Sequence, residues 1–262
     1  MNVVALVALG RSVEQEIPAL AADLGVTAYE AGMMLRAPPP VIVLRSEDRT
    51  RTANVLEKLR SRGHDAVACD LESVVSSEHM FRPKSFRLDG ESFIGTDRGE
   101  ERRLSLDGVF AFVRATHSTR NEDTVIEQHR KISLGRTALT GGMVRTRTVE
   151  MERKRVTQER EPVLYVFRHD AAPWLLASTQ MRYDGLAEAM KLSKIENFEV
   201  LLRILRERAP SAPFDTRLLS IRANPTVVSA SPKRLSTSSS STLDVLAHIV
   251  AIAQGRAARP YR

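Results

Sequence analysis

Features that often mark secreted, zinc-binding or membrane proteins are scarce in this sequence of 262 residues. Cys69 is the single cysteine, which excludes an internal disulfide and a zinc site built on several thiolates. The longest apolar run, residues 3 to 9, is far shorter than the roughly 20 residues that span a bilayer. This run also lacks a preceding basic segment and a following small-residue cleavage site, so we expect no signal peptide. We therefore expect a cytoplasmic protein without a transmembrane segment.

Motifs that carry chemistry are missing as well. Neither a GxxxxGK[ST] run nor a GxGxxG run after a strand is present, which excludes the common glycine-rich phosphate loops. The six histidines lack the i, i+4 spacing and acidic neighbours of a metalloenzyme helix. His169 and Asp170 are adjacent, and a hydrolase using them as an acid and base pair is one hypothesis, although a polar turn explains them more simply. The sequence therefore predicts no catalytic residue, no cofactor and no metal site.

Residues 1 to 72 show a β-α-α-β-α-β pattern. Ser12 and Thr27 are expected to cap the first two helices, and Gly25 fits the end of the first. The third helix is expected over residues 49 to 62. Its inward side chains are predicted to be Ala53, Leu56 and Leu59. The strands are predicted at residues 2 to 9, 41 to 44 and 66 to 69.

Several residues of this module resemble a known family. They are Leu24-Gly25 at a helix end, residues 27 to 31 opening the next helix, Pro40 before the middle strand, and Leu59 with Gly63 at the last helix. This pattern resembles the C-terminal domain of the bacterial ribosomal stalk protein and the related N-degron adaptor of Clp proteases. The resemblance implies a three-stranded antiparallel sheet with helices on one face, in proteins that bind other proteins. The stalk domain's glycine- and lysine-rich helix start is absent here, so no functional residue is carried over.

A second, β-rich domain is predicted over residues 84 to 210, after a candidate linker at residues 71 to 84. Residues 163 to 167 and 174 to 177 form a predicted hairpin, in which Trp174 fills the core. Two helices follow, a short one with Tyr183, Leu186 and Met190 on its apolar side and a longer amphipathic one. The apolar stripe of the longer helix is predicted to comprise Ile195, Phe198, Leu201, Leu202 and Leu205. About seven antiparallel strands closed by this helix resemble bacterial pleckstrin-homology-like (PH-like) domains, so the fold class is α+β; an α+β sheet of another topology is the alternative.

A long ribbon rich in Arg and Thr is predicted at about residues 116 to 160. Two strands, about 111 to 132 and 144 to 168, are expected to form it around a Gly-Gly loop. On an extended strand Arg145, Arg147, Arg153 and Arg155 project from one face, which suits a run of phosphates. Glutamates lie among these arginines, so a solvated face of mixed charge is the ordinary interpretation.

The C-terminal part of the chain is predicted to be a flexible tail, residues 211 to 241, followed by a helix at residues 242 to 255. An apolar patch near Phe214 can return along the sheet. The final helix carries one apolar stripe, Leu243, Leu246, Ile249 and Val250, which can dock on its own domain, on a second copy or on another protein.

Taken together, these patterns favour a non-enzymatic protein-binding scaffold or adaptor protein that self-assembles or binds another protein through the ribbon or the last helix. The alternative is binding of nucleic acid or anionic lipid through the arginines of the ribbon. A net charge of +7 favours an anionic partner of this kind.

Charge reversal tests this alternative. Replacing Arg145, Arg147, Arg153 and Arg155 with Glu should abolish salt-sensitive binding to nucleic acid or to anionic vesicles, because such binding depends on cation release from phosphates. Binding is measured by fluorescence anisotropy or vesicle sedimentation at several salt concentrations. Absence of wild-type binding at low salt would end the idea.

Overall fold

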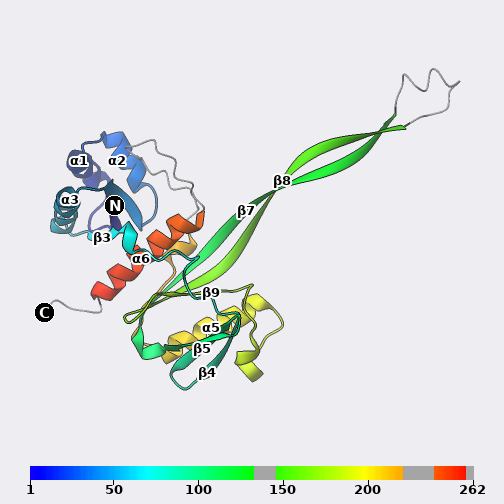
Figure 1. The fold of residues 1–262 in the computed structure, drawn as a ribbon. Coiled ribbons are helices and arrows are strands. Elements are labelled where there is room, and N and C mark those ends of the chain that lie inside the picture. Colours follow the sequence, from blue (N-terminus) through cyan, green and yellow to red (C-terminus); the bar gives the residue numbers. More distant parts are fainter. Residues whose placement is uncertain (133–145, 221–238, 258–262) are drawn as a thin grey trace. The chain divides into compact units, whose positions relative to one another are not determined.

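A computed structural model describes residues 1–132, 146–220 and 239–257 (Figure 1). The chain divides into two compact units, one made of Met1–His117 with Glu161–Arg262 and the other of Ser118–Arg160. Side chains are described for residues 1–117, 160–220 and 242–256. Among the described helices, none combines the length and apolar character needed to cross a membrane.

The N-terminal module has the predicted β-α-α-β-α-β order. Its elements are β1 (Asn2–Ala8), α1 (Val13–Leu24), α2 (Ala28–Leu35), β2 (Val41–Ser46), α3 (Arg49–Ser61) and β3 (Asp65–Asp70). The central strand β1 pairs antiparallel with both β2 and β3, so the three-stranded antiparallel sheet is confirmed. Ser12 and Thr27 cap α1 and α2 as predicted, and Gly25 ends α1 in the left-handed region with φ of 70°.

Strand β1 is buried on both faces. Val4 and Leu6 pack in the core that α1, α2 and α3 cover, whereas Val3, Ala5 and Val7 belong to a second core on the opposite face. Successive side chains of a strand point to opposite faces. The continuous apolar run of β1 is therefore explained by two covered faces, and helices are not confined to one side of this sheet.

The inward face of α3 differs from the prediction. Thr52, Val55 and Leu59 are buried, whereas Ala53 is exposed and Leu56 is half-buried. Steps of three and four residues from Leu59 lead to Val55 and Thr52, so these share one helix face. The predicted inward position of Ala53 is wrong because Ala53 lies on another face.

A buried carboxylate joins α1 to the end of α3. Glu16 accepts hydrogen bonds from Arg62 Nη2 at 2.7 Å, from Arg11 Nε at 2.7 Å and from His64 Nε2 at 2.7 Å. Burial alone raises the pKa of Glu16, but the hydrogen bonds from Arg62, His64 and Arg11 lower it below its usual value. This cluster satisfies a charge that burial would otherwise make costly.

The β-rich part contains two sheets and two further helices. Its elements are β4 (Ser85–Asp89), β5 (Ser92–Asp97), β6 (Glu100–Ser105), β7 (Val109–Ile132), β8 (Thr146–Arg168), β9 (Trp174–Ala177), α5 (Lys194–Arg208), β10 (Phe214–Asp215) and α6 (Ser239–Ala257). One sheet has the order β4-β5-β6 and the other the order β10-β7-β8-β9. The α+β class, the two long strands and the β8–β9 hairpin are confirmed.

Strand β10 is the exception to the predicted antiparallel arrangement. It returns along the sheet, as the apolar patch indicates, but it pairs parallel with β7 through Phe214 and Phe112. The chain reaches β10 only after α5, so its direction is set by the long connection from the hairpin and not by a tight turn. The closer resemblance to PH-like domains stays a prediction.

Helix α5 covers the sheets with most of the predicted stripe. Phe198, Leu201, Leu202 and Leu205 are buried, whereas Ile195 is 61% exposed, so its predicted burial is wrong. Ile195 lies in the first turn, before Asn197, the first buried residue of the helix.

The short helix predicted before α5 is shorter than expected. It is a 3-10 helix, Asp184–Ala189, interrupted at Ala187 by φ of 48°. Met190 follows this break and is exposed, so its predicted place on an apolar face is wrong. The break at Ala187 stops the helical periodicity on which that placement rests.

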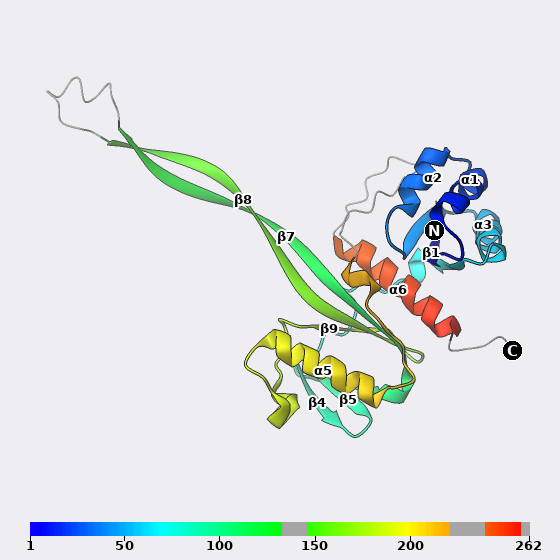
Figure 2. The same cartoon turned by 180° about the vertical axis from the view of Figure 1, so that it is seen from behind.

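Helix α6 packs within its own chain. Its ribbon lies next to β1 (Figure 2). Leu243, Leu246, Ile249 and Val250 are buried in a core with side chains of β1, β3, β7, β8 and β9. The sequence left open whether this helix docks on its own domain, on a second copy or on another protein. In the structure it docks on its own chain. The predicted linker contributes to this packing, since Ser77 and Met80 are both buried.

Polar groups fix the position of α6. The Tyr165 hydroxyl donates to Asp244 Oδ1 at 2.7 Å, and the Ser77 amide donates to Asp244 Oδ2 at 2.8 Å. His117 Nε2 lies 2.8 Å from the Tyr165 hydroxyl and therefore acts as the donor there. His248 Nδ1 donates to the Asp244 carbonyl, and its Nε2 accepts from the Val75 amide at 3.3 Å.

This arrangement predicts a loss of stability in weak acid. Burial lowers the pKa of His248 and of His117 from the usual 6.5, so the unfolded chain takes up protons before the folded one. The free energy of unfolding should therefore fall as the pH drops below about 6.5, by at most about 1.4 kcal/mol per pH unit for each histidine. Urea titrations at several pH values measure this loss.

The matched variants separate the two histidines. His248→Gln and His117→Gln should each flatten the dependence on pH, and the double variant should flatten it further. An unchanged slope in the double variant would contradict the assignment.

Candidate ligand-binding site

The structure places the predicted anion-binding arginines only in part. Arg147, Arg153 and Arg155 lie on β8, but their side chains are outside the described set, and Arg145 lies outside the described residues. Their common face stays a prediction. The predicted partner surface of α6, from Leu243 to Val250, is covered by the chain itself.

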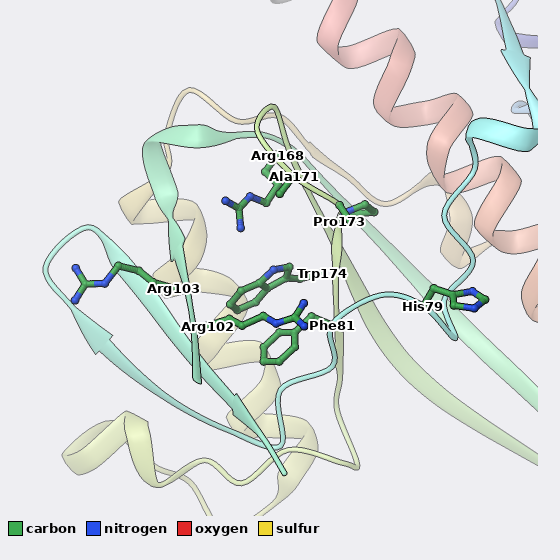
Figure 3. A pocket seen from close by; sticks show the side chains of 9 residues that line it. His79, Phe81, Arg102, Arg103, Arg168, Ala171, Pro173 and Trp174 are labelled. Atoms are coloured by element: carbon green, nitrogen blue, oxygen red, sulfur yellow. The ribbon is translucent and has the colours of Figure 1, made fainter. Parts of the chain in front are cut away.

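A basic hollow lies in the β-rich part of the molecule (Figure 3). It measures about 340 Å³. Strand β6, the end of β8, the turn after it and the start of β9 supply most of its wall. The lining residues are His79, Phe81, Arg102, Arg103, Arg168, Ala171, Ala172, Pro173 and Trp174.

Two aromatic rings form the floor of the hollow. The ring centroids of Phe81 and Trp174 are 4.6 Å apart, and the side chains are 8% and 3% exposed. Gly95 on β5 makes room for them, because a Cβ there would lie 2.9 Å from Trp174 and 3.0 Å from Phe81. The expected core-filling role of Trp174 is therefore confirmed.

Arg102 and Arg168 flank this floor. Gly95 is the partner of Arg102 across the sheet, so Arg102 projects to the face on which the aromatic rings lie. Its guanidinium carbon is 4.8 Å from the Phe81 ring centre, and its Nε donates to Glu100 at 2.7 Å. In Figure 3 the side chains of Arg168 and Arg102 lie on two sides of Trp174.

An ion pair with Asp170 orients Arg168. Arg168 Nε donates to Asp170 Oδ1 at 2.7 Å, and its Nη2 donates to Oδ2. The hydrogen bond raises the pKa of Arg168 and lowers the pKa of Asp170 to about 2. The adjacent His169 stacks on Phe110 with centroids 4.6 Å apart. His169 and Asp170 thus bind different partners, an arrangement that supports the polar-turn interpretation.

Strand β6 presents an open edge beside the hollow. Within the described parts of the chain, β5 is the one strand neighbour of β6, and residues 100 to 103 are exposed. The edges near β4 and β9 each take part in one further backbone hydrogen bond: the Arg182 amide donates to the Lys84 carbonyl beside β4, and the Leu175 amide of β9 donates to the Phe81 carbonyl. The edge of β6 can therefore accept hydrogen bonds from another extended chain.

A second surface feature is an apolar tip before and at the start of α5, formed by Met190, Leu192 and Ile195, all exposed. The side chain of Asn197 holds this tip, because it accepts from the Lys191 amide and donates to the Lys191 carbonyl. These three exposed apolar side chains form a surface that a protein partner can contact.

Metal binding finds no support in the described residues. They contain no group of three or more His, Cys, Asp or Glu side chains arranged to hold an ion. Cys69 is buried, and burial raises the pKa of its thiol, so it behaves as a small apolar side chain.

Sequence reasoning missed the basic hollow. Arg102 and Arg168 lie on strands far apart in the sequence, and each is followed or preceded by residues typical of a solvated strand or turn.

Gly95 provides a test of the floor. Gly95→Ala should lower the free energy of unfolding by about 1 to 3 kcal/mol, because the new methyl group overlaps Trp174, Phe81 and Pro83. Gly108→Ala is the matched control, since its nearest neighbour would be 3.9 Å away. Thermal and urea unfolding followed by tryptophan fluorescence measure both. Equal stability of the two variants would show that the floor is not packed as described.

Comparison of the chain with protein-family models, with curated proteins and with solved structures finds no match.

Proposed function

We propose that this protein is a polypeptide-binding scaffold or adaptor that takes an extended segment of a partner along the edge of β6. The single observation that carries the proposal is the exposed edge of β6 next to the basic hollow. The partner segment adds a strand to the sheet β4-β5-β6 and places alternate side chains on its two faces.

The charged side chains of β6 limit which chains can pair with its edge. Exposed strand edges readily pair with other chains, and charged side chains limit indiscriminate pairing. Glu100, Glu101, Arg102 and Arg103 give β6 such a charge pattern. A partner strand that places opposite charges against these four residues pairs favourably with β6.

The apolar tip supports the scaffold part of the proposal. Met190, Leu192 and Ile195 lie outside the hollow and offer a further contact for a protein. This function also agrees with the families that the N-terminal module resembles, whose members bind other proteins.

A peptide selection tests the proposal. A displayed library of random peptides is selected on the full-length protein, and a selected peptide is resynthesised with one backbone nitrogen methylated at a time. We expect binding to be lost at every second position, because only alternate amides of an added strand donate to β6.

Two results would contradict the proposal. One is a selection that yields no peptide above background. The other is a selected peptide whose methylation losses show no alternation, since that peptide does not bind as a strand.

A further inference from the structure

We propose that the hollow beside β6 receives an oxyanion carried by the bound polypeptide, held by Arg102 and Arg168. This inference rests on the proposed function and names the class of partner, an extended acidic segment. The oxyanion is the carboxylate of Asp or Glu or the phosphate of a phosphorylated residue.

The charged side chains that line the hollow are basic. Three arginines and one histidine line the hollow, and among the described residues no carboxylate does. The carboxylates that pair with these arginines, Glu100, Asp89 and Asp170, lie outside the lining. An anionic group in the hollow therefore lies beside arginines whose carboxylate partners are outside the lining.

Arg168 and Arg102 each have a guanidinium nitrogen that does not bind the carboxylate partner. Arg168 uses Nε and Nη2 on Asp170, so Nη1 is outside that pair. Arg102 uses Nε on Glu100, so both terminal nitrogens are outside that pair. Donors of this kind form short, charge-assisted hydrogen bonds with carboxylate and phosphate oxygens.

The environment strengthens Arg168 as a donor, whereas the Arg102 side chain is 50% exposed. The side chain of Arg168 is 13% exposed, and Asp170 fixes its orientation. Little side-chain entropy is then lost when a ligand binds. The buried rings of Trp174 and Phe81 form an apolar floor, which lowers the local dielectric constant and increases the attraction between opposite charges.

The walls of the hollow leave room for the ligand. Ala171 and Ala172 are exposed residues of the turn between β8 and β9, and their short side chains do not fill the mouth. A residue of the added strand opposite Arg102 projects to the same face as Arg102. An acidic residue at that position thus reaches the hollow from the edge of β6.

The same floor disfavours nucleic acid as the source of the oxyanion. Binding of single strands usually uses exposed aromatic faces on which bases stack. Here the Trp174 side chain is 3% exposed, and the Arg102 guanidinium lies over the Phe81 ring. The hollow offers donors for an oxyanion but no open ring for a base.

Variants of the turn and of the arginines test the inference. Ala172→Glu supplies a carboxylate at the mouth, which should compete with the ligand and weaken peptide binding about tenfold or more. Ala172→Gln is the matched control of equal size and should bind as the wild type does. Arg102→Gln and Arg168→Gln should each weaken binding about tenfold to a hundredfold.

The control for general charge effects is Arg203→Gln on α5, which is exposed and outside the hollow. Affinities are measured by isothermal titration calorimetry with a selected peptide and with versions in which its acidic residue is Asn, Gln or phosphoserine. Loss with Asn or Gln supports the oxyanion, and the ratio of the acidic to the phosphoserine peptide identifies its source.

The outcomes separate this inference from the proposed function. Selected peptides that bind equally well to wild type, Ala172→Glu and both arginine variants would overturn the inference and leave strand addition intact. A selection without peptides would overturn both. Tighter binding of a single-stranded oligonucleotide than of any peptide, lost in Arg168→Gln, would assign the hollow to nucleic acid instead.

Discussion

The burial of Asp244 against β8 is the interaction on which the rest of the larger unit depends. Its carboxyl group is enclosed and accepts from the Tyr165 hydroxyl and the Ser77 amide. An enclosed polar group without partners is costly, so α6 is favoured only in the register that supplies both donors. This register brings the apolar stripe of α6 onto the open face of β1 and onto β7, β8 and β9.

Helix α6 packs in one core of the β-rich part, and α5 packs in the other. The second core, under α5, is closed by aromatic and aliphatic side chains, with Trp174 and Phe81 at its margin. Gly95 lets these rings approach β5, and Arg102 covers the margin from β6. A basic hollow next to an open strand edge follows from this packing, because the rings fill the floor and the short turn residues leave the mouth open.

Much of the fold could be predicted from local signals. Capping by Ser12 and Thr27, the left-handed Gly25, and the β8–β9 hairpin each depend on residues close in sequence. The errors occur where a local pattern continues to residues that do not reach the core. Ile195 continues the stripe of α5 but lies in the first turn. The positive φ of Ala187 interrupts a helix that periodicity alone would extend to Met190.

The amino-acid sequence by itself determined the order of elements and the amphipathic character of α5 and α6, because periodicity and capping act over a few residues. Tertiary structure alone decided that α6 packs on its own chain and that β10 runs parallel to β7. It also decided that Arg102, Arg168 and Trp174 line the same hollow. Each of these depends on contacts between residues far apart along the chain, and one sequence carries no local signal for such pairs.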